Sequence, residues 1–169
     1  MNQLLETPRL RLRHFVSSDR DSLHSILGDA EVMRFSIRGV HNQKQIREFI
    51  DRQLLSYLAP GFGLYAIIHK QNDESIGYCG LLQQSVDGKK EIEIGYRLAK
   101  KYWGQGLATE AATAIAKYGR EKFGFQRLIC IIDPANKRSI RVAEKIGMKF
   151  ESDTIYRGVS VRIYLSTLD

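Results

Sequence analysis

The alternation of charged and apolar side chains predicts the first regular element of the chain. Residues 9–15, RLRLRHF, place an apolar side chain at every second position, which is the period of a half-buried β-strand. Three later apolar runs are separated by short polar turns at 72–73 and 87–88. These runs predict an antiparallel meander of strands over residues 63–69, 75–84 and 91–99.

Apolar spacings of three and four residues predict two helices between the first strand and the meander. A short helix over 19–28 would be capped by Ser18 and would end at Gly28. A longer helix over 43–58 follows Asn42, which has a glutamine three residues later, as in a capping box. The buried face of this longer helix is expected to consist of Ile46, Phe49, Ile50 and Leu54.

The second half of the chain alternates between helical and strand-like patterns. We expect a helix over 104–122, a buried strand over 127–133, a helix over 137–146, and a final hairpin of residues 148–156 and 159–167. Strand–helix–strand units of this kind favour parallel or crossover connections. The order of elements therefore predicts an α/β fold, with a mixed α+β sheet and helices on its faces.

Length and composition are typical of one globular domain. The chain has 169 residues, of which 43% are hydrophobic and 27% charged, so we expect a single domain over residues 1–169. The formal net charge of +7 suits an anionic ligand such as a nucleotide or phosphate, and it equally suits a basic surface without a ligand. No dense Lys/Arg run contains interleaved aromatic residues, which disfavours nucleic acid as a partner.

The cysteines and the apolar runs bear on compartment and membrane association. Cys79 and Cys130 each lie inside a strand-like apolar run, so we expect core thiols rather than a metal site. No apolar run approaches the roughly 18 residues that a membrane span needs, and the N-terminal segment has no signal-peptide pattern. These features predict a cytoplasmic protein with no metal and no membrane partner.

Residues 100–112, KKYWGQGLATEAA, place two glycines at the start of a predicted helix. A helix N-terminus leaves N–H groups without intrahelical partners and carries a positive partial charge, so it favours an anion. Glycine at Gly104 and Gly106 would let a phosphate approach the backbone, and Lys100 and Lys101 would add positive charge. The alternative is a glycine-rich turn that only leaves the strand.

Three stretches in this order, EIEIGYRL, KKYWGQGLATEAA and NKRSIRVAEKIGM, resemble the GNAT superfamily of N-acetyltransferases. The opening TPRLRLRHF resembles the branch of ribosomal-protein N-terminal (alanine) acetyltransferases. The resemblance covers nearly the whole chain. It implies a GNAT-like acyl-CoA N-acyltransferase fold, with acetyl-CoA as co-substrate and a primary amine as acceptor.

The resemblance also implies which residues hold acetyl-CoA. It assigns the pyrophosphate to the backbones of Trp103, Gly104, Gln105, Gly106, Leu107, Ala108 and Thr109. Lys101 stands where the family has Gln or Arg. The strand end formed by Tyr96, Arg97 and Leu98 would pair with the pantetheine amides like an added strand. Asn136 matches an asparagine that contacts the pantetheine arm, and it is also suited to capping the following helix alone.

The chemistry requires a base for the amine and an acid for the leaving thiolate. Many family members use a tyrosine as the acid, but the matching position here is Ala143. Ser139 matches a serine that the ribosomal-protein branch uses, and the alternative is an ordinary first-turn serine. Glu91 and Glu93 share a strand face and are candidates for the base, with Glu93 favoured; a salt-bridged carboxylate is the alternative. Glu110 is expected to anchor a loop or helix end.

The acceptor favoured at this stage is the N-terminal α-amine of a protein, such as a ribosomal protein. An α-amine has a pKa near 8, against about 10.4 for lysine, so its neutral form is easier to obtain. The 29–62 region is expected to form the acceptor groove and is not acidic, which disfavours a polyamine. Amino-acid and antibiotic acceptors, a homodimer, and a non-catalytic acyl-CoA sensor or basic RNA-associated module stay open as alternatives.

Overall fold

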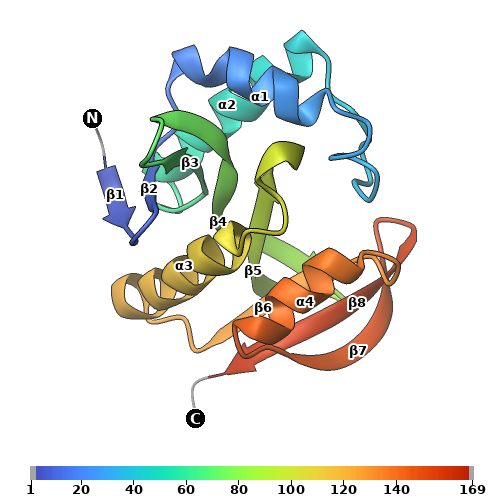
Figure 1. Cartoon of the computed structure of the whole chain (residues 1–169). Coiled ribbons are helices and arrows are strands. Elements are labelled where there is room, and N and C mark those ends of the chain that lie inside the picture. Colours follow the sequence, from blue (N-terminus) through green and yellow to red (C-terminus); the bar gives the residue numbers. More distant parts are fainter. Residues whose placement is uncertain (1–2, 168–169) are drawn as a thin grey trace.

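The computed structural model describes residues 3–167, which form eight strands and four α-helices (Figure 1). In chain order these are β1 Gln3–Glu6, β2 Leu10–Arg13, α1 Arg20–Leu27, α2 Gln43–Leu58, β3 Leu64–His69, β4 Glu74–Val86, β5 Lys89–Leu98, α3 Leu107–Phe123, β6 Arg127–Ile132, α4 Lys137–Lys145, β7 Lys149–Tyr156 and β8 Val159–Thr167. Short 3-10 turns, Ser17–Asp19 and Lys100–Tyr102, precede α1 and follow β5.

The strands form a mixed sheet in the order β1-β2-β3-β4-β5-β6-β8-β7. The meander β3–β4–β5 is antiparallel, as predicted. β5 and β6 pair in parallel across α3, whereas β6 and β7 are separated by β8, which is antiparallel to both. The α4 connection is therefore a crossover between two strands that run in the same direction without pairing.

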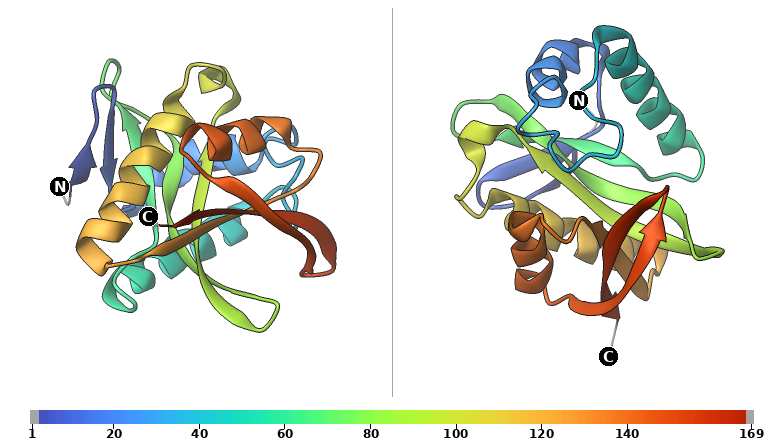
Figure 2. Two further views of the ribbon diagram at one scale, coloured as in Figure 1. Left: turned by 90° about the horizontal axis from the view of Figure 1, so that it is seen from below. Right: turned by 90° about the vertical axis from the view of Figure 1, so that its right-hand side faces the viewer.

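The helices cover the two faces of the sheet (Figures 1 and 2). On one face, α1 and α2 bury residues such as Ile26 and Phe49 against strand residues such as Ala66. On the other face, α3 and α4 bury Ala112 and Ala143 in a larger cluster. The small alanine side chains of α3 let this helix lie close to the sheet, as its sequence indicates.

The parallel pair at the centre of the sheet positions the site. The register between β5 and β6 is set by one partner pair, Glu93 with Ile129. Past this pair β5 continues to Leu98 and leads into α3, while β6 ends at Ile132 and leads into α4. The N-termini of α3 and α4 therefore lie at the carboxyl ends of two parallel strands, where open α/β sheets bind ligands.

The predicted start of the first helix is wrong. Ser18 lies inside a 3-10 turn, and Asp19 occupies the N-cap position of α1. The Asp19 carboxylate is buried. Its charge is compensated by hydrogen bonds from the Val16 N–H at 2.8 Å and from the Arg13 guanidinium at 2.8 Å. An ion pair with the preceding strand thus fixes this turn, which a search for local caps does not detect.

Helix α2 differs from its prediction at one position of its buried face. Ile46, Phe49 and Ile50 are buried as expected, but Leu54 is 37% exposed and Gln53 is buried instead. The Gln53 side-chain oxygen accepts a hydrogen bond from the Leu64 N–H at 2.9 Å, so a polar side chain completes the start of β3. The capping box of Asn42 is confirmed.

Two further features complete the comparison with the sequence. Strand β1 was not predicted, because QLLE shows no alternation, but it pairs antiparallel with β2 at the edge of the sheet. Cys79 and Cys130 are buried free thiols, as predicted. None of the helices in residues 3–167 is long and apolar enough to cross a membrane.

Candidate active site

A cavity of about 740 Å³ opens at the carboxyl ends of β5 and β6. Its walls come from the segment 31–36, from β5, from the loop into α3, and from the end of β6 together with α4. The cavity is lined by all the predicted site residues except Gln105: Glu93, Tyr96, Arg97, Leu98, Trp103, Gly104, Gly106, Leu107, Ala108, Thr109, Asn136 and Ser139. The fold therefore brings together residues that the sequence analysis selected separately.

The loop before α3 has the conformation that its two glycines permit. Gly104 has φ +73° and Gly106 has φ +76°, in the left-handed region that L side chains rarely adopt. Nothing lies within 4 Å of the position of a Cβ at Gly104, so backbone conformation rather than crowding requires glycine there. Gly106 is the N-cap of α3, and the first-turn N–H groups of this 17-residue helix face an anion-binding position.

The segment between β1 and β2 binds this loop and the first turns of α3 through hydrogen bonds. The Glu110 carboxylate accepts hydrogen bonds from the Thr7 hydroxyl at 2.5 Å, from the Arg9 N–H at 2.8 Å and from the Arg9 Nε at 2.6 Å. Arg9 Nη1 in turn donates to the Gln105 carbonyl at 2.8 Å. Burial would raise the pKa of Glu110, but the hydrogen bonds from Thr7 and Arg9 outweigh it and lower that pKa. Glu110 is thus an anchor, as predicted, and its partners were not foreseen.

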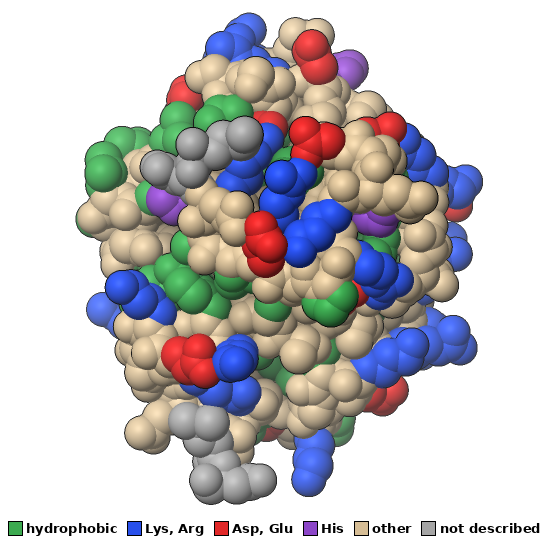
Figure 3. Space-filling model, turned by 60° about the vertical axis from the view of Figure 1, so that its left-hand side comes forward, with side chains coloured by type: hydrophobic (Ala, Val, Ile, Leu, Met, Phe, Trp, Pro, Cys, Tyr) green, Lys and Arg blue, Asp and Glu red, His purple; other side chains and the backbone are tan. Residues whose placement is uncertain are grey.

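The positive charge beside the loop does not come from the lysines that the sequence suggested. Lys101 pairs with Glu74 at 2.6 Å and Lys100 pairs with Glu31 at 2.5 Å, so their charges are largely neutralised. Basic and acidic side chains are likewise interspersed on the face in Figure 3. The basic side chains that line the cavity are Lys137, Arg138, Arg141 and Lys145 of α4, together with Arg34 and Arg97.

Trp103 connects the loop to the basic helix. Its indole Nε1 donates to the Leu98 carbonyl at 2.9 Å, and the Arg138 guanidinium lies 4.3 Å from the centre of its ring. The hydrogen bond ties the loop to the end of β5, and the cation–π contact orients Arg138 toward the cavity. These contacts give Trp103 a structural role beside the backbone contact that the family resemblance implies.

Asn136 caps α4. Its side-chain oxygen accepts a hydrogen bond from the Ser139 N–H at 3.2 Å, which satisfies a first-turn donor of the helix. The predicted capping role of Asn136 is confirmed, and its predicted contact with the pantetheine arm stays a prediction. Capping uses only the oxygen of the amide, so its nitrogen can still donate to a ligand in the cavity.

A tyrosine and a serine meet at the centre of the cavity. The Tyr96 hydroxyl donates to the Ser139 carbonyl at 2.9 Å and lies 2.9 Å from Ser139 Oγ. Burial raises the pKa of Tyr96 well above its ordinary value, so this hydroxyl stays protonated. Ala143, the position at which many family members have a tyrosine, is fully buried in the core. A phenolic hydroxyl is therefore present, but β5 supplies it instead of α4.

Three carboxylates line the cavity, those of Glu31, Glu93 and Asp133, and Glu93 is the one that β5 supplies. Burial raises the pKa of Glu93 to about 7, although a hydrogen bond of 2.8 Å from Gln84 Nε2 opposes this shift. A carboxylate with such a pKa is partly ionised and partly protonated at neutral pH, which suits proton transfer. Gln84 reaches it from the neighbouring strand β4, a contact that the sequence did not reveal.

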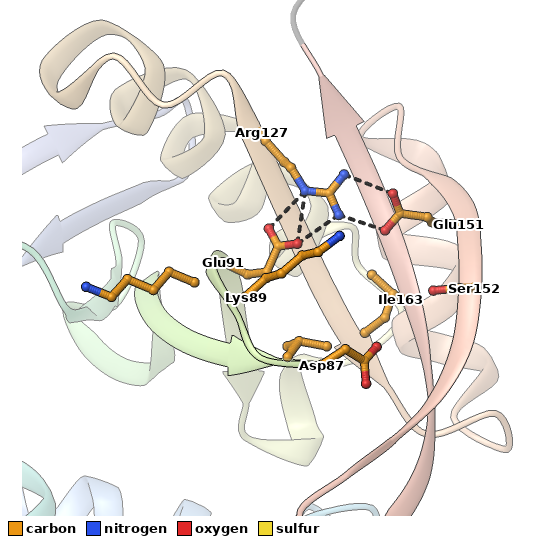
Figure 4. Close-up of a pocket in the computed structure, with 9 residues that line it drawn as sticks. Asp87, Lys89, Glu91, Arg127, Glu151, Ser152 and Ile163 are labelled. Carbon is orange, nitrogen blue, oxygen red and sulfur yellow. Dashed lines mark hydrogen bonds and ion pairs between the residues drawn. The ribbon is translucent and has the colours of Figure 1, made fainter.

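Glu91 does not take part in this site. Arg127 donates to its carboxylate at 2.9 and 3.0 Å and also binds Glu151 at 2.7 Å. Figure 4 shows this arginine between the two carboxylates, beside a separate cavity of about 530 Å³. The salt-bridge alternative thus holds for Glu91, which links β5 to β6 and β7 and is excluded as the base.

Comparisons with known proteins agree with this geometry. The model of the acetyltransferase (GNAT) domain family matches residues 9–149, and the chain belongs to this family. It has the fold of the GNAT acetyltransferases and is an acetyltransferase.

Individual relatives show how far the likeness extends. An uncharacterised Bacillus subtilis protein, YkkB, is 37% identical over 147 residues, which are 86% of this chain and 85% of that protein. A GNAT-family acetyltransferase structure from Bacillus anthracis is 27% identical, with a TM-score of 0.82 over 96% of this chain and 97% of that one. RimL, a ribosomal L7/L12 α-N-protein acetyltransferase solved with coenzyme A, is 20% identical, with a TM-score of 0.82 over 99% of both chains, and shows the fold alone.

Proposed function

We propose that the protein transfers the acetyl group of acetyl-CoA to the N-terminal α-amine of a protein, by direct attack in a ternary complex. The observation that carries this proposal is one cavity that joins three parts. These are the left-handed glycine loop with the N-terminus of α3, the Glu93 carboxylate, and the Tyr96–Ser139 pair. Together they supply an anion site, a base and a protonated hydroxyl.

The residues fit acetyl-CoA. The glycine loop leaves no side chain between a phosphate and the first-turn N–H groups of α3, and α4 lines the same cavity with four basic side chains. β5 and β6 diverge past Glu93, so the end of β5 at residues 96–98 can pair with the amides of the pantetheine arm. When bound, acetyl-CoA supplies the thioester that a neutral amine attacks.

Two different residues carry out the two proton transfers of the reaction, one as base and one as acid. Glu93 accepts a proton from the ammonium form of the acceptor, directly or through water, because its raised pKa lies close to that of an α-amine. Ser139 Oγ gives its proton to the leaving sulfur and regains one through water from the nitrogen that has attacked the thioester, while the Tyr96 hydroxyl stays protonated and holds Ser139 through the 2.9 Å contact. Ser139 is thus the acid and Tyr96 the group that supports it.

An N-terminal acceptor is supported by the pKa of its amine and by one structural relative. RimL acts on the α-amine of a ribosomal protein and shares the fold over nearly its whole length. Of the 29–62 region that was expected to form the acceptor groove, the segment 31–36 lines the cavity, and Ile37 and Val40, which follow it in the chain, are exposed, as suits contact with a peptide. We also keep the predictions of a single domain over residues 1–169 and of a cytoplasmic location.

The proposal is tested by release of free thiol from acetyl-CoA in the presence of N-terminal peptides, spermidine and amino acids. Acetylation of a peptide α-amine, strongly reduced but measurable in Glu93→Gln with acetyl-CoA affinity retained, is the expected result. Tight binding of acetyl-CoA without turnover on any acceptor would instead indicate the sensor. Salt-sensitive RNA binding would indicate the RNA-associated module.

A further inference from the structure

Two arginines line the cavity, and two more lie in the neighbouring segments of the chain. Arg34 and Arg97 line it, from the 29–41 segment and from β5. Arg38 belongs to the same segment, and Arg157 lies in the turn between β7 and β8. The segment and the turn both lie on the side of the molecule that faces the viewer in the right-hand view of Figure 2. The arginines therefore come from three parts of the chain, and the segment and the turn that carry three of them lie on the same side of the molecule.

The position of Arg97 is fixed by the segment beside it. Its Nη1 donates to the Val32 carbonyl at 3.3 Å and contacts Met33 Sδ at 2.6 Å. Its Nε is buried without a hydrogen-bond partner among the described residues. The guanidinium is thus held in place, and part of its hydrogen-bonding capacity is unused. An unpaired donor of this kind can bind an acceptor atom of a ligand.

The charges of these arginines are not neutralised within the chain. Across residues 3–167, no carboxylate lies within ion-pair distance of any of the four. Glu31, which also lines the cavity, is already paired with Lys100. Asp133, the third carboxylate of the cavity, lies just past the end of β6 and accepts a hydrogen bond from the Ala135 N–H. Burial raises the pKa of Glu93, so this carboxylate carries only part of a negative charge near pH 7. The acceptor end is therefore electropositive.

Electrostatic effects on two groups agree with this arrangement of the arginines. Burial raises the pKa of Glu93, while Arg157 and Arg97 lower it. Burial likewise raises the pKa of Tyr156, and Arg157 and Arg38 lower it. Arg157 thus acts on the same carboxylate as Arg97 and on the same tyrosine as Arg38, so one charged group at the opening would meet several of them.

We propose that these arginines select acceptor proteins whose N-terminal amine is followed by acidic side chains. The inference rests on the proposed function, with the amine at Glu93 and the carboxylates of the acceptor beside Arg38, Arg97 and Arg157. Guanidinium and carboxylate groups form paired hydrogen bonds, which give orientation as well as attraction. A polyamine would bring positive charge to the same place and would be repelled.

The surface around the opening suits a peptide. Ile37 and Val40 on one segment, and Ile155 and Val159 beside the turn, are 39–64% exposed. Apolar side chains next to arginines are common where a protein partner binds, because they add buried area around the charged contacts. A small amino acid that fills only the cavity would not cover these side chains.

The test uses three peptides of equal length that begin with alanine and differ only at their second and third residues, which are glutamate, glutamine or lysine. We expect kcat/KM to be about tenfold higher for the glutamate peptide than for the glutamine peptide, and lowest for the lysine peptide. The preference should shrink as ionic strength rises, because salt screens exposed charges.

The variants assign the preference to the arginines. Arg157→Glu should reduce the ratio between the glutamate and glutamine peptides by about fivefold; the ratio is the readout, because Arg157 also lowers the pKa of Glu93 and its replacement acts on both peptides alike. Lys149→Glu is the matched control, because it makes the same charge change on an exposed side chain at the far end of β7. It should leave the ratio unchanged.

The outcomes separate this inference from the proposed function. Equal kcat/KM for the three peptides, or an equal effect of the Lys149 and Arg157 changes, would overturn the inference and leave N-terminal acetylation intact. Transfer to spermidine and to none of the peptides would overturn both.

Discussion

Removal of the Glu110 carboxylate should weaken both the fold and the binding of acetyl-CoA. Glu110→Ala deletes the acceptor of three hydrogen bonds, from the Thr7 hydroxyl, the Arg9 N–H and the Arg9 Nε. The Glu110 side chain is 15% exposed, so its two contacts from Thr7 and the Arg9 N–H contribute about 1.5 kcal/mol each. The Arg9 side chain is 46% exposed, so its ion pair contributes less than about 1 kcal/mol. A loss of about 3 kcal/mol is expected.

The effect on the ligand passes through Arg9. Without Glu110 the Arg9 guanidinium is free to leave the Gln105 carbonyl, which it now binds at 2.8 Å. If the less well oriented loop lowers the binding free energy of acetyl-CoA by about 1 kcal/mol, the Kd rises about fivefold. The free energy of unfolding is measured by urea denaturation and the Kd by calorimetry, with Glu121→Ala as the control, since Glu121 is an exposed glutamate on the same helix.

Measurements at several pH values sharpen this test. The pKa of Glu110 is lowered in the folded state, so its contribution to stability is present at neutral pH and is lost as pH falls through that lowered pKa. The difference in stability between wild type and Glu110→Ala should therefore shrink in acid. An unchanged Kd, with stability reduced as expected, would refute the role of this contact in shaping the phosphate loop.

Four further changes test the site and the core. Gly104→Val should weaken acetyl-CoA binding by more than about tenfold, because φ +73° strains any L side chain; unchanged affinity by calorimetry would exclude the loop. Ser139→Ala and Tyr96→Phe should each lower kcat more than they change the Kd for acetyl-CoA, and equal turnover in both would remove the pair from the mechanism. With a peptide acceptor, the slope of log kcat/KM against pH should be about two below pH 7 in wild type, where both Glu93 and the α-amine must lose a proton, and should fall to about one as Glu93 ionises. Glu93→Gln should show a slope of about one throughout this range, and the same profile in both proteins would exclude Glu93 as the base. Gln53→Leu should cost about 1–3 kcal/mol in urea denaturation, because it leaves the Leu64 N–H without its 2.9 Å acceptor, and no loss would show that β3 does not depend on it.

Much of the fold follows from local patterns in the sequence. The period-two runs and the turns at 72–73 and 87–88 identify the meander, and the capping box at Asn42 identifies the start of α2. These features can be read from the sequence because each depends only on residues that are close together along the chain. Ser18, Leu54 and strand β1 show the limit, since a buried ion pair, a side-chain acceptor for another strand and an edge pairing decide them.

The candidate site was predicted in part for the same reason. The glycine loop is a local motif, so its residues were selected in advance, and all of them except Gln105 line the cavity. The exclusion of Glu91, the Tyr96 hydroxyl beside Ser139, and the contacts of Arg9 with Glu110 depend on residues far apart in the chain. Only the folded arrangement shows which carboxylate is already paired and which tyrosine reaches the helix.

The central claim, acetyl transfer to an N-terminal amine, is tested most directly by mass spectrometry of two matched peptides incubated with the protein and acetyl-CoA. One peptide has a free α-amine and no lysine, and the other has a blocked α-amine and one lysine. The account predicts acetylation of the first peptide at its N-terminus, dependent on Glu93, with little modification of the second. Acetylation of the lysine peptide alone, or of neither peptide by protein that binds acetyl-CoA, would contradict it.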